Sequence, residues 1–113
     1  MASIFTRILN GEIPGKIIHQ DEYCAAIADI NPQAPHHILI FPRQEIRSID
    51  AATPKDQNVL GHMLLIAGEI ARKQGFNNGG YRLVVNTGKN GGQTVDHIHI
   101  HLLGGRQLEW PPG

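Results

Sequence analysis

His97-Ile98-His99-Ile100-His101-Leu102-Leu103 is the stretch that most constrains the fold of this 113-residue chain. Imidazole and aliphatic side chains alternate in it with a period of two, which is typical of a β-strand because successive side chains of a strand point to opposite faces. We therefore expect a strand over residues 95–103. Its three imidazoles should share a solvated face, and its aliphatic side chains should share a buried one.

Imidazole has an ordinary pKa of about 6.5, so most of it is neutral at pH 7 and can act as nucleophile, proton donor or metal ligand. In a straight strand His97 and His101 would lie roughly 13 Å apart, too far to share a zinc ion with bonds of about 2 Å, although neighbouring histidines could share one. Cys24 is the only cysteine, so no CxxC pair adds ligands. The motif alone leaves three interpretations open: catalytic imidazoles, a metal site, or a polar strand face.

Composition narrows the class of protein. Ten basic residues balance ten acidic ones, which argues against a broad basic surface for nucleic acid. No apolar run approaches the roughly 20 residues that span a bilayer, and the first 15 residues lack a signal-peptide core. We expect a single domain over residues 1–113, located in the cytoplasm, with neither a membrane nor nucleic acid as partner. Cys24 should be a small buried side chain in a strand.

The remaining pattern predicts an α+β fold. Ser3 should cap a short helix that ends at Asn10-Gly11, and Thr53 with Pro54 should begin a long helix that Gly75 closes. Further strands are expected over residues 16–20, 23–29, 38–41 and 81–86. These elements predict a five-stranded antiparallel sheet with one long and one short helix.

The long helix carries two faces. A wide apolar stripe should face the core, and it consists of Val59, Leu60, Met63, Leu64, Ala67, Ile70 and Ala71. Gly61, Leu65 and Gly68 share the opposite face, where small residues would let a second helix approach across a two-fold axis. Incidental surface glycines are the alternative.

Several further motifs lie along the chain, namely residues 29–35 (DINPQAP), His37, residues 84–86 (VVN), 91–93 (GGQ), 103–107 (LGGRQ) and 110–113 (WPPG). Together with the alternating histidines they resemble the Hint branch of the histidine-triad superfamily over nearly the whole chain. The resemblance implies a homodimer that hydrolyses the P–N bond of purine nucleoside 5′-phosphoramidates. It further implies hydrolysis of the related acyl or aminoacyl adenylates. It also implies AMP, GMP and their phosphoramidates as the bound small molecules, a nucleotidyl-histidine intermediate, and no metal or other cofactor.

The resemblance also implies roles for single residues. His99 is the nucleophile, His97 and His101 flank the phosphate, and His37 is the fourth histidine of the active site. Asp29 accepts hydrogen bonds from the ribose hydroxyls, although by itself it would be an ordinary turn residue. The purine is walled by Phe5, Ile8, Ile27, Ile30 and Leu39, and the phosphate or scissile nitrogen is bound by Asn86, Gly92 and Thr94. Trp110 would shape the leaving-group pocket of the partner subunit.

Two positions depart from the Hint pattern. Thr94 stands where serine is the commonest residue of this branch. Asp96 stands where an apolar or aromatic residue is usual, and we expect its charged side chain to be solvated. His36 should point away from His37, and no role is implied for His19 or His62.

The alternatives to a phosphoramidase are a dinucleoside polyphosphate hydrolase of the Fhit type and a non-catalytic module that binds nucleotide or zinc.

Overall fold

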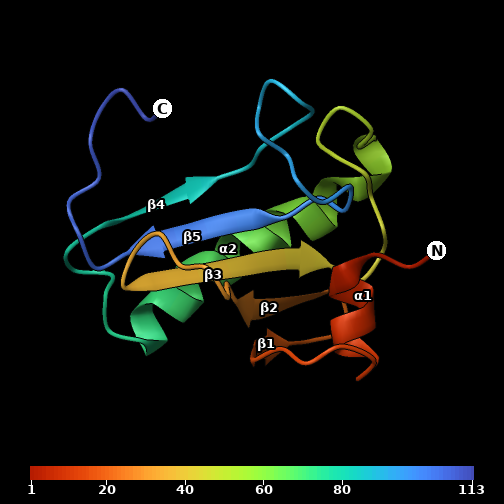
Figure 1. Ribbon diagram of the computed structural model, residues 1–113, viewed down its shortest axis with the longest axis horizontal. Helices are drawn as coiled ribbons and strands as arrows, with labels where there is room; N and C mark the ends of the chain where they lie inside the picture. Colours follow the sequence, from red (N-terminus) through yellow and green to blue (C-terminus); the bar gives the residue numbers. More distant parts are fainter.

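The computed structural model describes all 113 residues, and its centre is one five-stranded antiparallel sheet. The strands are β1 (Ile17–Gln20), β2 (Cys24–Ala28), β3 (His36–Pro42), β4 (Tyr81–Val84) and β5 (Ile100–Gly104), in the spatial order β1-β2-β3-β5-β4. Helix α2 (Gln57–Lys73) crosses one face of the sheet, and the short helix α1 (Ile4–Leu9) lies beside the end of β3 and the start of β2 (Figure 1). The predicted sheet and its two helices are confirmed.

Ser3 caps α1 as predicted, whereas the α-helix that was predicted to begin at Pro54 begins three residues later, at Gln57. The Ser3 hydroxyl accepts from the Thr6 amide at the start of α1. Thr53 and Asp56 form a reciprocal capping box around a single 3-10 turn, η1 (Pro54–Asp56), which leads directly into α2. Gly75 follows α2 with φ of +79°, a left-handed conformation that favours glycine.

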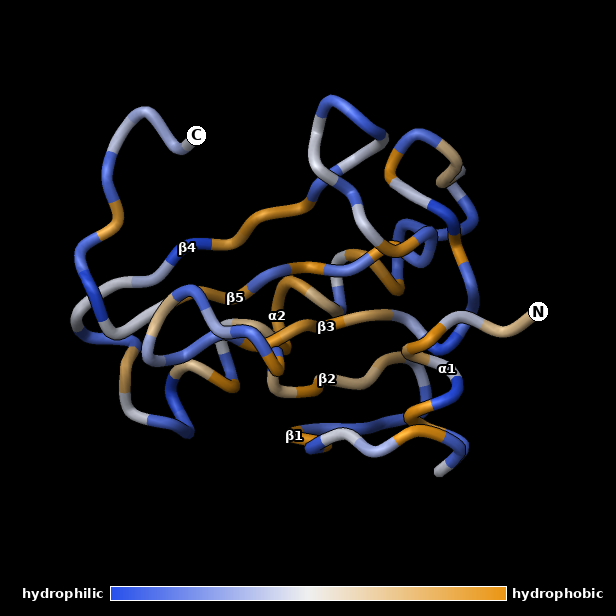
Figure 2. Tube along the Cα trace, in the orientation of Figure 1, coloured by the Kyte–Doolittle hydropathy of each residue, from blue (hydrophilic) through white to orange (hydrophobic).

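The two faces of the sheet carry separate apolar clusters. The larger cluster lies under α2 and includes Cys24, Ile40, Met63 and Leu102, all fully buried. The smaller cluster lies under α1 and centres on Phe5 and Phe41, whose rings stack at 4.7 Å. In Figure 2 the chain through β2 and β3 is mostly orange to tan, whereas the loop between β4 and β5 is mostly blue and white. The burial of Cys24 is confirmed.

The prediction was wrong for one residue of the apolar stripe on α2. Leu64 is 51% exposed, and Ile66 is buried in its place. At about 100° per residue, Leu64 lies just beyond the edge of the arc formed by Met63, Ala67 and Ala71, while Ile66 closes the other edge. Leu65 is also exposed, so two neighbouring leucines of α2 lie outside the core.

The strand expected over residues 95–103 is shorter than predicted, because pairing with β3 begins only at Ile100, opposite Ile40. β3 ends at Pro42, which has no N–H to continue a ladder. The Pro42 carbonyl accepts instead from Nε2 of His97, and the Ile98 amide donates to the Ile46 carbonyl. Residues 95–99 therefore leave the sheet, although Ile98, Ile100 and Leu102 are buried as expected.

No helix of the chain combines the length and apolar character that a membrane span requires.

The strand predicted over residues 81–86 is likewise shorter than expected, because β4 ends at Val84.

Gly104 at the end of β5 provides a test of packing between the sheet and the segment after α2. A Cβ on Gly104 would collide with Cδ2 of Phe76 and lie 2.7 Å from Cε2. The Phe76 ring is held in place because it stacks on His36 at 4.1 Å and meets Tyr81 edge-on. Gly104→Ala should therefore lower the free energy of unfolding by about 1–3 kcal/mol, the usual cost of overpacking, as measured by urea denaturation.

Gly79→Ala is the matched control, because nothing lies within 4 Å of a Cβ at Gly79. An unfolding midpoint for Gly104→Ala equal to that of Gly79→Ala would show that the contact with Phe76 does not constrain β5.

Candidate functional site

A cavity of about 210 Å³ opens between α1, the end of β2, the middle of β3, and the segment that precedes β5. Nine of the residues predicted for the site line it, namely Phe5, Ile8, Ile27, Asp29, Ile30, Leu39, Thr94, His99 and His101. Sequence reasoning missed six further lining residues, which are Ile4, Ile13, Pro14, Gly15, Ala28 and Val95. Apart from its few polar groups the cavity is apolar, and these polar groups gather at one end.

His99 presents one free ring nitrogen at this cavity. Its Nδ1 lies 2.8 Å from the main-chain oxygen of His97, and a carbonyl only accepts, so Nδ1 carries the proton. The other nitrogen, Nε2, has no hydrogen-bond partner in the protein. Every buried side-chain nitrogen or oxygen does have such a partner, so Nε2 is not a buried atom. Nε2 is therefore reachable from the cavity, and its lone pair is unprotonated while the ring is neutral.

His101 presents the opposite group. The Gln33 amide donates to Nδ1 of His37 at 3.0 Å, so the proton of a neutral His37 sits on Nε2. That Nε2 lies 2.9 Å from Nδ1 of His101 and donates to it. The proton of His101 is consequently on its own Nε2, which has no partner in the protein. The Gln33 amide thus determines, through the hydrogen bond between His37 and His101, which nitrogen of His101 carries the proton. His101 then offers an N–H donor beside the lone pair of His99.

His97 does not lie where a phosphate could reach it, which corrects the expectation of a solvated triad face. Its side chain is fully buried, and both ring nitrogens are already engaged by the protein. Nε2 donates to the Pro42 carbonyl at 2.7 Å, and Nδ1 accepts from the Ser3 hydroxyl. His97 instead orients the site, because its side chain anchors the segment whose carbonyl fixes the proton of His99.

All four histidines of this group are held in the neutral form. Burial lowers the pKa of His37, His97 and His99. Burial also lowers the pKa of His101 to about 4, helped by the neighbouring His99 and His37 rings, while the Asp29 carboxylate opposes the shift. Neutral His99 is the form that a nucleophile requires.

Asp29 serves the turn role considered from the sequence and also lies at the cavity. Its Oδ1 accepts from the Asn31 amide at 2.8 Å, as a turn residue does, and its Oδ2 lies 3.4 Å from Nε2 of His37. The side chain is 19% exposed and lines the cavity, and a carboxylate has about four acceptor positions. Capacity therefore remains for hydroxyl donors.

The polar residues predicted for phosphate binding are only partly brought together. Thr94 lines the cavity and also a neighbouring polar hollow, which Gly92 lines as well. Asn86 lines neither of them. Asp96 is exposed and lies 3.3 Å from Arg47, which confirms that it is solvated.

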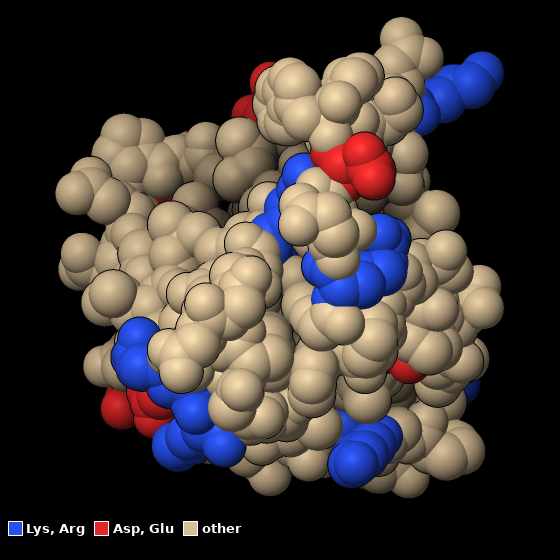
Figure 3. Space-filling model, turned by 90° about the vertical axis from the view of Figure 1, so that its left-hand side faces the viewer, with Lys and Arg blue, Asp and Glu red and all other residues tan.

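His36 points away from His37, as expected, because its ring stacks on Phe76 under the other face of the sheet. On the side of the molecule drawn in Figure 3, basic side chains form several separate groups, some beside acidic ones. This side shows no continuous basic area.

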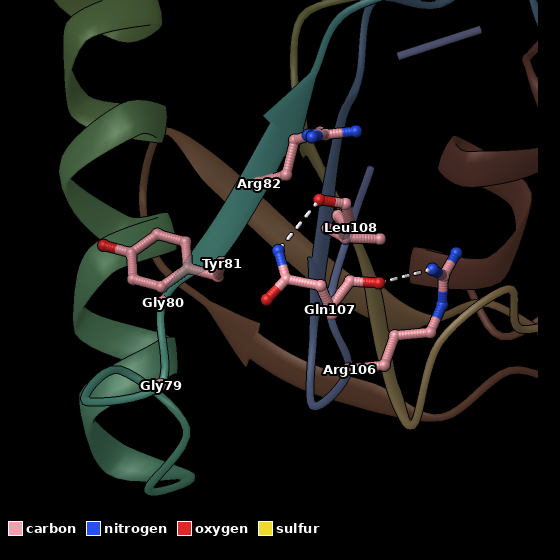
Figure 4. A pocket seen from close by; sticks show the side chains of 7 residues that line it. All are labelled: Gly79, Gly80, Tyr81, Arg82, Arg106, Gln107 and Leu108. Atoms are coloured by element: carbon pink, nitrogen blue, oxygen red, sulfur yellow. Dashed lines mark hydrogen bonds between the residues drawn. The ribbon is translucent and has the colours of Figure 1, made fainter. Parts of the chain in front are cut away.

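A second hollow, of about 190 Å³, lies between β4 and the C-terminal segment (Figure 4). Its guanidinium groups are used to hold that segment, since Arg82 donates to the Glu109 carbonyl and Arg106 to the carbonyls of Gln33 and Gln107. The hollow contains neither imidazole nor carboxylate. The two arginines of this hollow therefore position the C-terminal segment.

Known proteins share the sequence pattern and the fold of this chain. The model of the HIT domain matches residues 10–108. An uncharacterised HIT-like protein of Synechococcus elongatus is 52% identical, over 98% of this chain and 96% of its own length. The crystal structure of a HIT family hydrolase from Legionella pneumophila superposes with a TM-score of 0.95 at 45% identity, covering 99% of this chain and all of the other.

A histidine triad protein from Clostridium difficile is 38% identical with a TM-score of 0.90, over 94% of this chain and 92% of the other. The match to the domain model covers most of the sequence, and these relatives align over nearly its whole length. The chain therefore belongs to the HIT domain family.

Proposed function

We propose that this protein is a purine nucleoside phosphoramidase of the Hint branch, which hydrolyses the P–N bond of nucleoside 5′-phosphoramidates. One observation carries the proposal: the unprotonated Nε2 of His99 opens onto the cavity while the His97 carbonyl holds the proton on Nδ1. A neutral imidazole fixed in this tautomer is ready to attack phosphorus without first losing a proton.

The reaction proceeds in two displacements. Nε2 of His99 attacks the α-phosphorus, the P–Nε2 bond forms as the bond to the amine breaks, and the departing nitrogen takes up a proton from solvent. Water then bonds to phosphorus as the P–Nε2 bond breaks, which gives a proton back to solvent, releases the nucleoside monophosphate and leaves His99 in its neutral form. The Nε2–H of His101 donates to the phosphate oxygens as charge develops on them, and Thr94 offers its hydroxyl to the leaving nitrogen.

The apolar part of the cavity suits a purine base. Phe5 and Ile8 come from α1, and Ile27 and Leu39 come from facing positions on β2 and β3. Asp29 follows β2 at the mouth of the cavity, where its carboxylate would accept from the 2′- and 3′-hydroxyls of the ribose. AMP, GMP and their phosphoramidates are the small molecules that we propose for the site.

We also propose that the protein works as a homodimer in the cytoplasm. The exposed Leu64 and Leu65 of α2 support a second helix packing there. Trp110 is 82% exposed and so does not cover its own core. In Figure 1 the C-terminal segment runs beyond β4, away from the cavity of its own chain. A tail in this position would supply Trp110 to the leaving-group pocket of the partner subunit.

His99→Ala should reduce the turnover of adenosine 5′-phosphoramidate by at least about 10³-fold, because no other group presents a lone pair at the same place. The measurement is kcat/KM with the purified protein, in the presence and absence of a chelator, with diadenosine triphosphate as the competing substrate. His36→Asn is the matched control, since that ring lies under the other face of the sheet. Near-normal turnover by His99→Ala, or faster hydrolysis of diadenosine triphosphate, would contradict the proposal.

Asp29→Asn should narrow the preference for ribonucleotides over 2′-deoxyribonucleotides by roughly 10- to 100-fold, because a hydrogen bond to a charged group is worth about 1.5–3 kcal/mol. Asparagine keeps an oxygen for the Asn31 amide, so the turn after β2 is preserved. The ratio of kcat/KM for the two sugars is the measurement. An unchanged ratio would exclude Asp29 as the acceptor for the ribose hydroxyls.

A further inference from the structure

A second cluster of imidazole, carboxylate and thiol groups lies on the α2 side of the sheet, remote from the cavity. Its members are His19 of β1, Asp21 of the turn after β1, Cys24 at the start of β2, and His62 of α2. Nε2 of His19 and Nε2 of His62 each lie 2.8 Å from the same oxygen, Oδ2 of Asp21. The Cys24 thiol lies 3.7 Å from that oxygen as well.

The Asp21 carboxylate is rigidly placed. Its other oxygen, Oδ1, accepts from the amides of Tyr23 and Cys24 at 2.8 and 2.9 Å. Three side-chain donors therefore converge on Oδ2 alone, although one carboxylate oxygen has only about two acceptor positions. The guanidinium of Arg43 does not contact this carboxylate, since it donates to the Asp21 carbonyl and to the Gln20 side chain.

These donors are of the kind and spacing that a transition metal uses. One ligand atom each of His19, Asp21 and Cys24 lies within 4.8 Å of the others. In a tetrahedral zinc site, bonds of about 2.0–2.3 Å place neighbouring ligand atoms roughly 3.3–3.8 Å apart. The separations of 2.8 and 3.7 Å around Oδ2 lie on either side of this range. His62 contacts the group only through Oδ2 of Asp21 and lies outside the set of three, so its ring would have to move toward His19 and Cys24 as an ion binds.

Charge and access also fit. A carboxylate and a thiolate together would neutralise a doubly charged ion, and two neutral imidazoles would complete four ligands. His19, Asp21 and His62 are all partly exposed, which gives an ion a path from solvent.

We propose that His19, Asp21, Cys24 and His62 form a site for a divalent transition-metal ion of the zinc class. Because His62 belongs to α2 and the other three residues belong to the β1–β2 hairpin, a bound ion would clamp the hairpin to the helix. The site is independent of the proposed reaction, which uses the opposite face of the sheet.

The test must separate this site from Asp29, His37 and His101, whose ligand atoms also lie within 4.8 Å of one another. We would therefore use the full chain with His101→Asn, which breaks that second group, and remove metal with a chelator. Titration calorimetry with Zn²⁺ should show one ion bound per chain, and Tm should rise with the Zn²⁺ concentration. Adding His19→Gln or His62→Gln should weaken binding by at least about tenfold, whereas adding His36→Asn should not.

Co²⁺ gives a second readout that does not depend on the histidine variants. Its complex with the His101→Asn protein should show the near-ultraviolet charge-transfer absorption of a cobalt thiolate, and Cys24→Ser should abolish that absorption. Failure of the His101→Asn protein to bind Zn²⁺, binding that survives His19→Gln, or a Co²⁺ complex without thiolate absorption would each overturn the proposal.

Discussion

The hydrogen bond from Nδ1 of His99 to the His97 carbonyl is the interaction on which the site depends. The chain joins the sheet only at Ile100, so the His97 carbonyl lies outside the β-ladder and accepts from the imidazole two residues later. Pro42 ends β3 at this level, and its carbonyl captures the His97 ring. The Ser3 hydroxyl completes the arrangement, since it accepts from the Thr6 amide at the start of α1 and donates to His97. Helix α1 and the segment before β5 are thus fixed to each other.

Two identical side chains acquire opposite chemistry at this place. His99 and His101 are both neutral imidazoles, but a backbone carbonyl fixes the proton of the first on Nδ1, while the Gln33 amide, acting through His37, fixes the proton of the second on Nε2. One ring then offers a lone pair and the other offers a donor to the same cavity. Low pKa values keep both rings in these states, because burial penalises the charged forms. This pairing is what we expect of a site that attacks phosphorus and stabilises its oxygens.

Local patterns predicted most of the fold. The alternation around His99 placed Ile98, Ile100 and Leu102 in the core. Ser3 marked the start of α1, and Thr53 with Pro54 marked the 3-10 turn that leads into α2. The start of β5 and the burial of His97 could not be predicted in this way, because they depend on Pro42 and Ser3, which are distant in the sequence. The same holds for the proton on His101, which is set by the Gln33 amide, and for the convergence of His19 and His62 on Asp21. The resemblance identified nine of the cavity residues, but only the three-dimensional arrangement distinguishes the orienting His97 from the accessible His99.

The central claim is that the protein backbone holds His99 and His101 in opposite neutral tautomers, and long-range ¹⁵N–¹H correlation NMR of the histidine rings measures this directly. The expected result is a proton on Nδ1 of His99 and on Nε2 of His101. Since the pKa of His101 is lowered to about 4, its ring should stay neutral as the pH falls below 6.5 and gain a second proton only near pH 4. A proton on Nε2 of His99, or a His101 ring that titrates near pH 6.5 like a free imidazole, would contradict it.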